Sequence, residues 1–227
     1  MNSLLGSTVA ALRPFFHDLA GGAFTTIATS VVAFALGMVI GVVLLLMRAH
    51  GGRVLAGFVI FYVSLIRGTP ALIQMLVAYY VLPAVLNVPL SPVQAGILAL
   101  ALNTAAYVSE ILRGALNSLG RGQMPAARAL GMGSLQVWRY IVLPQLFYRS
   151  IPPLTSEFTM LLKASSLMSI IAVHDLATVA RDATLQTDLP LQVFSATAVI
   201  YFAILFVASS ASRRLERRVA KVLPNVH

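Results

Sequence analysis

The stretch that decides how this chain is interpreted runs from Pro125 to Pro144 and reads PAARALGMGSLQVWRYIVLP. It lies in the one long polar segment of an otherwise apolar sequence. Two adjacent alanines, Ala126 and Ala127, together with Gly131, offer a smooth helical surface on which another protein can sit closely. The stretch therefore indicates a membrane subunit that is driven by something it does not itself contain.

The composition around this stretch is that of a membrane protein. The chain has 227 residues, of which 59% are hydrophobic and 10% charged, whereas soluble domains carry about 25% charged residues. No charged residue falls in Ala20–Met47, Gly68–Ser109 or Leu189–Ser212. Each run is long enough to cross roughly 30 Å of hydrocarbon at about 1.5 Å per residue. The sequence therefore predicts an all-α integral membrane protein.

Prolines and charges divide the apolar runs into five expected spans. The spans are Gly22–Met47, Pro70–Leu86 (after a short helix Val54–Ile66 and a kink), Val93–Leu112, a fourth within Ile141–Val173 broken by Pro144, Pro152 and Pro153, and Leu191–Ser210. Glu110–Tyr140 is expected to be an aqueous loop with two short helices, and His174–Leu189 a polar loop. Gly37 and Gly41 have the GxxxG spacing that permits close helix packing.

Basic residues set the expected orientation. They gather after the first span, in the segment 110–140 and in the tail, which places the N-terminus outside and the C-terminus in the cytoplasm. The net charge of +9 is explained in this way, so nucleic-acid binding is not expected. We divide the chain into an N-terminal interfacial or extracytoplasmic segment 1–19, a transmembrane domain 20–212 with a loop at about 114–140, and a basic cytoplasmic tail 213–227 that contacts membrane lipid.

The spacing in the polar segment resembles a known family. Pro125-Ala126-Ala127, then Gly131 and Ile141-x-Leu143-Pro144, match the EAA loop of ABC-importer permeases in every interval. The flanking elements Arg67–Pro70, Glu110–Gly114 and Leu162–Leu167 are similar to those of the polar amino-acid uptake branch (histidine, glutamine or arginine type), and the likeness covers about residues 20–212.

This resemblance implies a fold, partners and a site. It implies a type I importer permease in the bacterial inner membrane, with a coupling helix that docks on ATPase subunits through Ala126, Ala127, Gly131, Leu143 and Pro144. The implied partners are two ATP-binding subunits, a second permease chain and a free or tethered amino-acid-binding protein. The chain lacks a phosphate-binding P-loop, so ATP and Mg²⁺ are expected on the partners and no cofactor or catalytic site here.

Two positions depart from the family pattern. Pro125 stands where the family has glutamate. A helix tolerates proline in its first turn, so the helix can still begin there. The lost glutamate contact slightly favours a heterodimer with a permease that keeps it over a homodimer. Ala164 stands where the family often has Asp or Asn, so the resemblance does not identify the amino acid.

Four polar residues within the apolar runs are candidates for the substrate pathway: Arg67, Asn103, Glu157 and Lys163. Glu157 either attracts the ammonium group of a substrate or pairs with Arg67 or Arg149. Asn103 either lines the pathway or bonds a neighbouring helix. Arg67 either lines the pathway or holds the break at Pro70.

Other function classes fit less well. A self-sufficient secondary transporter or channel remains the alternative, although no inverted repeat is visible. A serine hydrolase using His174 and Asp175 is disfavoured, because adjacent residues do not face each other on a helix. The absence of cysteine and of an HExxH motif argues against thiol chemistry and metal binding.

Overall fold

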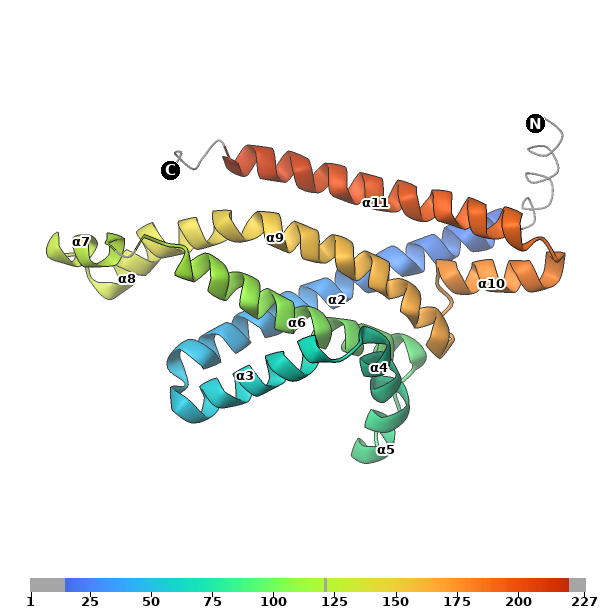
Figure 1. The fold of residues 1–227 in the computed structure, drawn as a ribbon, viewed down its shortest axis with the longest axis horizontal. Coiled ribbons are helices and arrows are strands. Elements are labelled where there is room, and N and C mark those ends of the chain that lie inside the picture. Colours follow the sequence, from blue (N-terminus) through green and yellow to red (C-terminus); the bar gives the residue numbers. More distant parts are fainter. Residues whose placement is uncertain (1–14, 121, 221–227) are drawn as a thin grey trace.

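The computed structural model describes residues 15–120 and 122–220, and these form a bundle of helices (Figure 1). In chain order the elements are α2 (Phe16–His50), α3 (Gly52–Gly68), α4 (Ala71–Leu76), the π-helical η2 (Val77–Val81), α5 (Leu82–Leu86), α6 (Pro92–Asn117), α7 (Gln123–Ala129), α8 (Ser134–Val137), the π-helical η3 (Trp138–Val142), α9 (Leu143–Ala164), the 3₁₀-helical η4 (Ser165–Ile171), α10 (Leu176–Thr187) and α11 (Pro190–Ala220). Residues 1–14 of the expected interfacial segment 1–19 lie outside the described residues.

Three helices among the described residues, α2, α6 and α11, are long and apolar enough to span, and the count reaches the expected five only if each of two bent helix pairs is one span. The expected second span, Pro70–Leu86, is not a candidate alone: only together with α3 does it pass as one. In the two bent pairs, α3 meets the segment 71–86 at 109°, and the segment 134–171 meets α10 at 50°. The first bend lies at Thr69-Pro70, where the sequence predicted a kink, because proline biases the preceding residue away from helix.

The central contact of the bundle joins α2 and α6, which run parallel. A Cβ atom on Gly37 would lie 2.8 Å from Thr104, and one on Gly41 would lie 2.5 Å from Val108. From Gly37 to Gly41 in α2, and from Thr104 to Val108 in α6, the contact moves four residues in the same chain direction. The GxxxG pair therefore forms one side of a close parallel helix contact. The expected packing role of these glycines is therefore confirmed.

Helix α6 is the centre of the bundle and α11 its periphery. Of the apolar window of α6, 61% is buried, against 11% for α11. On one side of α6, the hydroxyl of Tyr62 in α3 donates to the Leu102 carbonyl at 2.7 Å. On another side α9 packs against α6, and α11 runs along α9 (Figure 1).

Two π-helical turns have a common cause. Each ends two residues before a proline, namely Pro83 after η2 and Pro144 after η3. Proline has no amide donor and its ring clashes with the carbonyl four residues earlier. In a π turn each carbonyl accepts from the amide five residues later instead of four. The carbonyl that would face the proline then bonds the amide of the next residue, and the helix continues.

The expectation that Pro152 and Pro153 break the fourth span is wrong. Helix α9 continues through both residues from Leu143 to Ala164. Both rings lie on an exposed face, while the preceding Ile151 is buried and Ser150 donates to the Leu146 carbonyl at 2.7 Å. Packing on the opposite face therefore holds the helix together where two amide donors are missing.

The expectation of a polar loop at His174–Leu189 is also wrong. Residues 176–187 form α10, whose N-cap Asp175 accepts a hydrogen bond from the Thr178 amide at 2.9 Å. Apolar residues in the helical pattern i, i+3, i+4 and i+7 are buried against α2 and α11: Leu176, Val179, Ala180 and Ala183. The charged residues occupy the other face. The sequence prediction counted these charges and so missed the apolar helical pattern.

The elements gather at two ends of the bundle. Helices α7 and α8, the α2–α3 turn and the last turns of α11 lie toward one end, and α10, α4 and α5 lie toward the other (Figure 1). The basic residues that were expected in the cytoplasm, such as Arg48 and Arg213, belong to the first end.

Candidate functional site

The polar segment forms a helical hairpin whose turn is defined by Gly131. Helix α7 ends in a Schellman motif, in which the Gly131 amide bonds the Arg128 carbonyl at 2.9 Å and the Met132 amide bonds the Ala127 carbonyl at 3.1 Å. Gly131 has φ +80°, and a Cβ atom there would meet nothing within 4 Å. The turn therefore requires glycine for its backbone conformation rather than for close seating of a partner.

The two alanines of the hairpin have different surroundings. Ala127 is only 3% exposed and packs with Leu119, Val137 and Val142 in a small core inside the hairpin. Ala126 is exposed on the outer face of α7. Of the predicted smooth surface, Ala126 is thus free to touch a partner, whereas Ala127 holds the hairpin together.

The hairpin is fixed to both helices that flank it. Gln145 in α9 donates to the side-chain oxygen of Gln123 in α7 at 2.6 Å. On the other side, Leu116 of α6 and Leu119 just after it pack with Ala127 in the core of the hairpin. Arg149 in α9 donates to the carbonyl of Ser118 at 2.7 Å, which ties α9 to the end of α6. The hairpin is therefore bonded to α9 and packed against the end of α6.

Three family positions lie at the borders of these helices. Leu143 and Pro144 are the first two residues of α9, and both are exposed. Pro125 lies in the first turn of α7, where its missing amide donor would have no intrahelical partner. The expectation that a helix tolerates proline at this position is confirmed.

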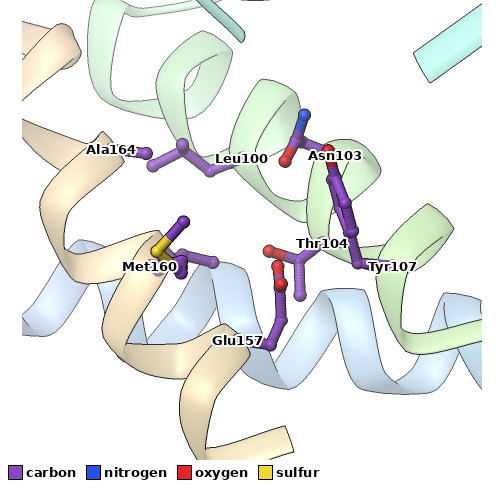
Figure 2. A pocket seen from close by; sticks show the side chains of 8 residues that line it. Leu100, Asn103, Thr104, Tyr107, Glu157, Met160 and Ala164 are labelled. Atoms are coloured by element: carbon purple, nitrogen blue, oxygen red, sulfur yellow. The ribbon is translucent and has the colours of Figure 1, made fainter. Parts of the chain in front are cut away.

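A second candidate site is a cavity of about 190 Å³ between α6 and α9. Figure 2 shows Asn103, Thr104 and Tyr107 of α6 on one side and Glu157 and Met160 of α9 on the other. The Glu157 carboxylate and the Thr104 hydroxyl point toward each other across the cavity. This is a small chamber with a carboxylate, an amide and hydroxyl groups set in apolar walls.

Glu157 is the charged group of this chamber. Among the described residues it lies within 4 Å of no basic side chain, and neither Arg67 nor Arg149 pairs with it. A carboxylate in a membrane helix is costly and normally has a partner. The geometry leaves Glu157 available to a cation in the cavity.

Asn103 bonds a neighbouring helix, as one of its two expected roles required: its amide donates to Gln74 of α4 at 2.8 Å. It also lines the cavity. The amide of Gln74 in turn donates to the carbonyls of Ile66 and Thr69 at 2.7 and 3.0 Å. Gln74 thereby satisfies the backbone at the α3–α4 break and joins this break to the cavity.

Arg67 lies beside the cavity rather than in its wall. Its guanidinium is 5.5 Å from the centre of the Tyr107 ring and 3.9 Å from Glu110. Glu110 also binds Arg48 of α2 and Arg113 of α6, each at 2.6 Å. One carboxylate thus joins α2, α3 and α6, which agrees with a structural role for Arg67.

Lys163 is exposed and does not line the cavity, so the structure does not bring it to the other pathway candidates. Sequence reasoning missed Gln74, Thr104 and Tyr107, which look like ordinary residues of apolar spans. For Gln74, the only available signal was an amide four residues after Pro70, where freed carbonyls need donors.

Comparison with known proteins identifies the class. Residues 33–221 match the family described as binding-protein-dependent transport system inner membrane component. The chain therefore belongs to this family, and it is a permease subunit of an ABC importer.

Curated relatives span nearly the whole chain. The L-cystine transport system permease protein TcyB of Bacillus subtilis (strain 168) is 37% identical over 92% of this chain and 91% of its own length. The glutamine transport system permease protein GlnP of Escherichia coli (strain K12) is 34% identical over 92% of this chain and 96% of its own length.

Solved structures agree with the fold. A crystal structure of an amino acid ABC transporter with histidines matches with a TM-score of 0.86 and 30% identity, covering 92% of this chain and 97% of that one. An inward-facing MetNI methionine ABC transporter matches with a TM-score of 0.76 and 21% identity, covering 91% and 98%, which supports the fold alone. The expected type I importer permease fold is confirmed.

Proposed function

We propose that this permease forms the membrane pathway for a polar amino acid and is driven by ATPase subunits that bind the α7–α8 hairpin. The observation that carries this proposal is the hairpin itself, which exposes Ala126, is bonded to α9 through Gln123 and packs against the end of α6. These two helices also form the cavity with Glu157. Motion of the hairpin would therefore change the shape of the cavity.

The substrate class is argued from the cavity and from the relatives. Glu157 offers a carboxylate to an ammonium group, and Asn103 offers an amide to a second polar group of the substrate. An amino acid carries both kinds of group. The relatives named for cystine and glutamine transport support the same class.

The assembly needs further subunits. ATP and Mg²⁺ would bind two partner ATPases, and a binding protein, free or tethered, would deliver the substrate. A second permease would complete the core, and Pro125 in place of the family glutamate slightly favours a heterodimer. The coupling residues are Ala126, Leu143 and Pro144 at the surface, with Ala127 and Gly131 maintaining the hairpin.

The proposed location is the bacterial inner membrane, with the hairpin end of the bundle in the cytoplasm. This orientation puts the N-terminal segment 1–19 outside, the transmembrane domain at 20–212 and the tail 213–227 inside. The arginines at the hairpin end support it, because cytoplasmic ends carry an excess of basic residues.

The first test is purification of the tagged chain from its native membrane together with its bound subunits. An Ala126→Trp variant should lose the ATPase subunits and ATP-driven uptake, because a large side chain holds the docking surfaces apart. Ala84→Trp is the matched control, since Ala84 is also exposed but lies on α5 at the other end of the bundle.

Two results would contradict the proposal. One is an Ala126→Trp complex that keeps its ATPase and its uptake. The other is a lone chain that transports without ATP, which would favour a secondary transporter or channel.

A further inference from the structure

A polar cleft of about 330 Å³ lies beside the Glu157 cavity, between α9 and α11. Met160 lines both the cleft and the cavity. Five hydroxyl groups line the cleft: Thr155, Ser156, Thr159, Ser209 and Ser212. The side chain of Met160 therefore separates the chamber that holds the Glu157 carboxylate from a neighbouring polar chamber.

The cleft extends from the cavity toward the hairpin end of the bundle. Its lining runs along α9 from Met160 back to Thr155, and along α11 from Ser209 to Glu216. Both directions lead to the hairpin end, because α9 begins there and α11 ends there (Figure 1). With the hairpin end in the cytoplasm, as proposed above, the cleft leads from the cavity toward the cytoplasm.

Two side chains of opposite charge, Arg213 and Glu216, complete the lining of the cleft. They are three residues apart on α11, which places their Cβ atoms about 5–6 Å apart. Within the described residues, neither lies within 4 Å of an oppositely charged group. Instead, the Thr155 hydroxyl donates to Glu216 at 2.6 Å, and Arg213 donates to the Ser210 hydroxyl at 2.9 Å. Both charges therefore remain available to a ligand.

The exposure of this polar lining indicates contact with water rather than with lipid. Ser156 and Arg213 are exposed, and Thr159 and Glu216 are half-buried. Lipid tails offer no hydrogen bonds, and polar or charged side chains in membrane helices normally face a water-filled cavity or a partner. Hydroxyl groups and charges on the facing sides of α9 and α11 are therefore expected to line an aqueous path.

We propose that this cleft is a second substrate site, on the cytoplasmic side of the Glu157 cavity, which binds the backbone zwitterion of an amino acid. Arg213 binds the carboxylate, Glu216 binds the ammonium group, and the hydroxyl groups bond the remaining polar atoms. Methionine has a flexible, unbranched side chain, so a rotamer change of Met160 would open the way from the cavity to the cleft. This inference rests on the proposed function.

The test uses a single thiol in the cleft, because the chain contains no cysteine. In the complete importer without ATP, mass spectrometry of the permease follows the reaction of Ser212→Cys with a maleimide. An equimolar mixture of the common amino acids, without cysteine, should slow this reaction severalfold. The same mixture with acetylated α-amino groups, or with amidated α-carboxylates, should not slow it. Ala211→Cys is the matched control, since Ala211 is exposed beside Ser212 but does not line the cleft.

Charge variants in the Ser212→Cys background assign the two contacts. Arg213→Ala and Glu216→Gln should each raise the amino-acid concentration needed for half-protection about tenfold or more, because each removes a charge-assisted bond. Arg213→Lys should keep most of the protection. Arg217→Ala should have no effect, because Arg217 is exposed and does not line the cleft. Glu157→Gln should leave the protection at position 212 in place even though it lowers uptake, since Glu157 belongs to the other chamber.

The outcomes separate this inference from its alternatives. Equal protection by the acetylated mixture would overturn it in favour of a simple anion site. An unprotected thiol in an importer that takes up amino acids would also overturn it, and a crosslink from position 212 to a second permease would then identify a protein contact. Uptake is measured on the same preparations, because a wild type without ATP-driven uptake contradicts the proposed function instead.

Discussion

At the scale of single residues, the unusual feature is Glu157, a carboxylate that faces a cavity with no basic side chain within 4 Å in the part of the chain that the structure describes. Replacing Glu157 by Gln keeps its shape and removes its charge. We expect uptake of cationic and neutral amino acids alike to fall about tenfold or more, because both carry the α-ammonium group and a charge-assisted contact contributes about 1.5–3 kcal/mol. Uptake of labelled lysine and of labelled glutamine in proteoliposomes would measure this change.

The conservative variant Glu157→Asp is the control, since it retains the charge and should keep most of the uptake. Unchanged uptake of both substrates by Glu157→Gln would rule out contact with the substrate ammonium.

Another residue-scale prediction concerns the α2–α6 contact. Gly41→Ala places a methyl group 2.5 Å from the Val108 side chain, which is fully buried and β-branched and so cannot easily rotate away. Overpacking of this kind costs about 1–3 kcal/mol, so the thermal midpoint in detergent should fall.

Adding Val108→Ala should restore part of that loss, because it removes the atoms that the methyl group meets. Gly57→Ala, where a Cβ atom meets nothing within 4 Å, is the matched control. Equal effects at positions 41 and 57 would show that helix propensity, and not the close contact, dominates.

At the scale of elements, α10 depends on its cap. Asp175 is 1% exposed and bonds the Thr178 amide, so Asp175→Ala should destabilise the first turn of α10 by about 1 kcal/mol. Faster hydrogen exchange of the amides of residues 176–180 would reveal this loss. Asp175→Asn should restore protection, because asparagine caps equally well. Asp182→Ala, which removes only an exposed ion pair, should leave the exchange unchanged.

Some of these elements could be predicted from the sequence and others could not. The spans, the kink at Pro70 and the hairpin follow from local signals: charge-free runs, a proline and a spaced motif. Helix α10 and the burial of Ala127 do not, because each depends on which face meets another element. Likewise, Glu157 and Thr104 are 53 positions apart, and only the packing of α9 on α6 brings them to one cavity.

At the scale of the whole molecule, the bundle has a predicted direction in the membrane. The chain contains no cysteine, so single cysteines can report which end faces the cytoplasm. Val88→Cys, near α5, should react with an impermeant maleimide in intact cells, and Leu135→Cys, in α8, only after permeabilisation. Both positions are at least 50% exposed, so equal reactivity is expected after permeabilisation. The reverse pattern in intact cells would invert the proposed topology.

The parallel contact of α2 with α6 also constrains how the protein is made. Gly37 and its neighbour Thr104 are 67 positions apart, with α3, α4 and α5 between them in the chain. At about 5–20 residues per second, a ribosome needs roughly 3–13 s to produce the second helix after the first. During that interval the glycine face of α2 has only lipid or the insertion machinery to cover it. Membrane insertion of α2 must therefore precede, by seconds, the docking that gives its glycines their partner.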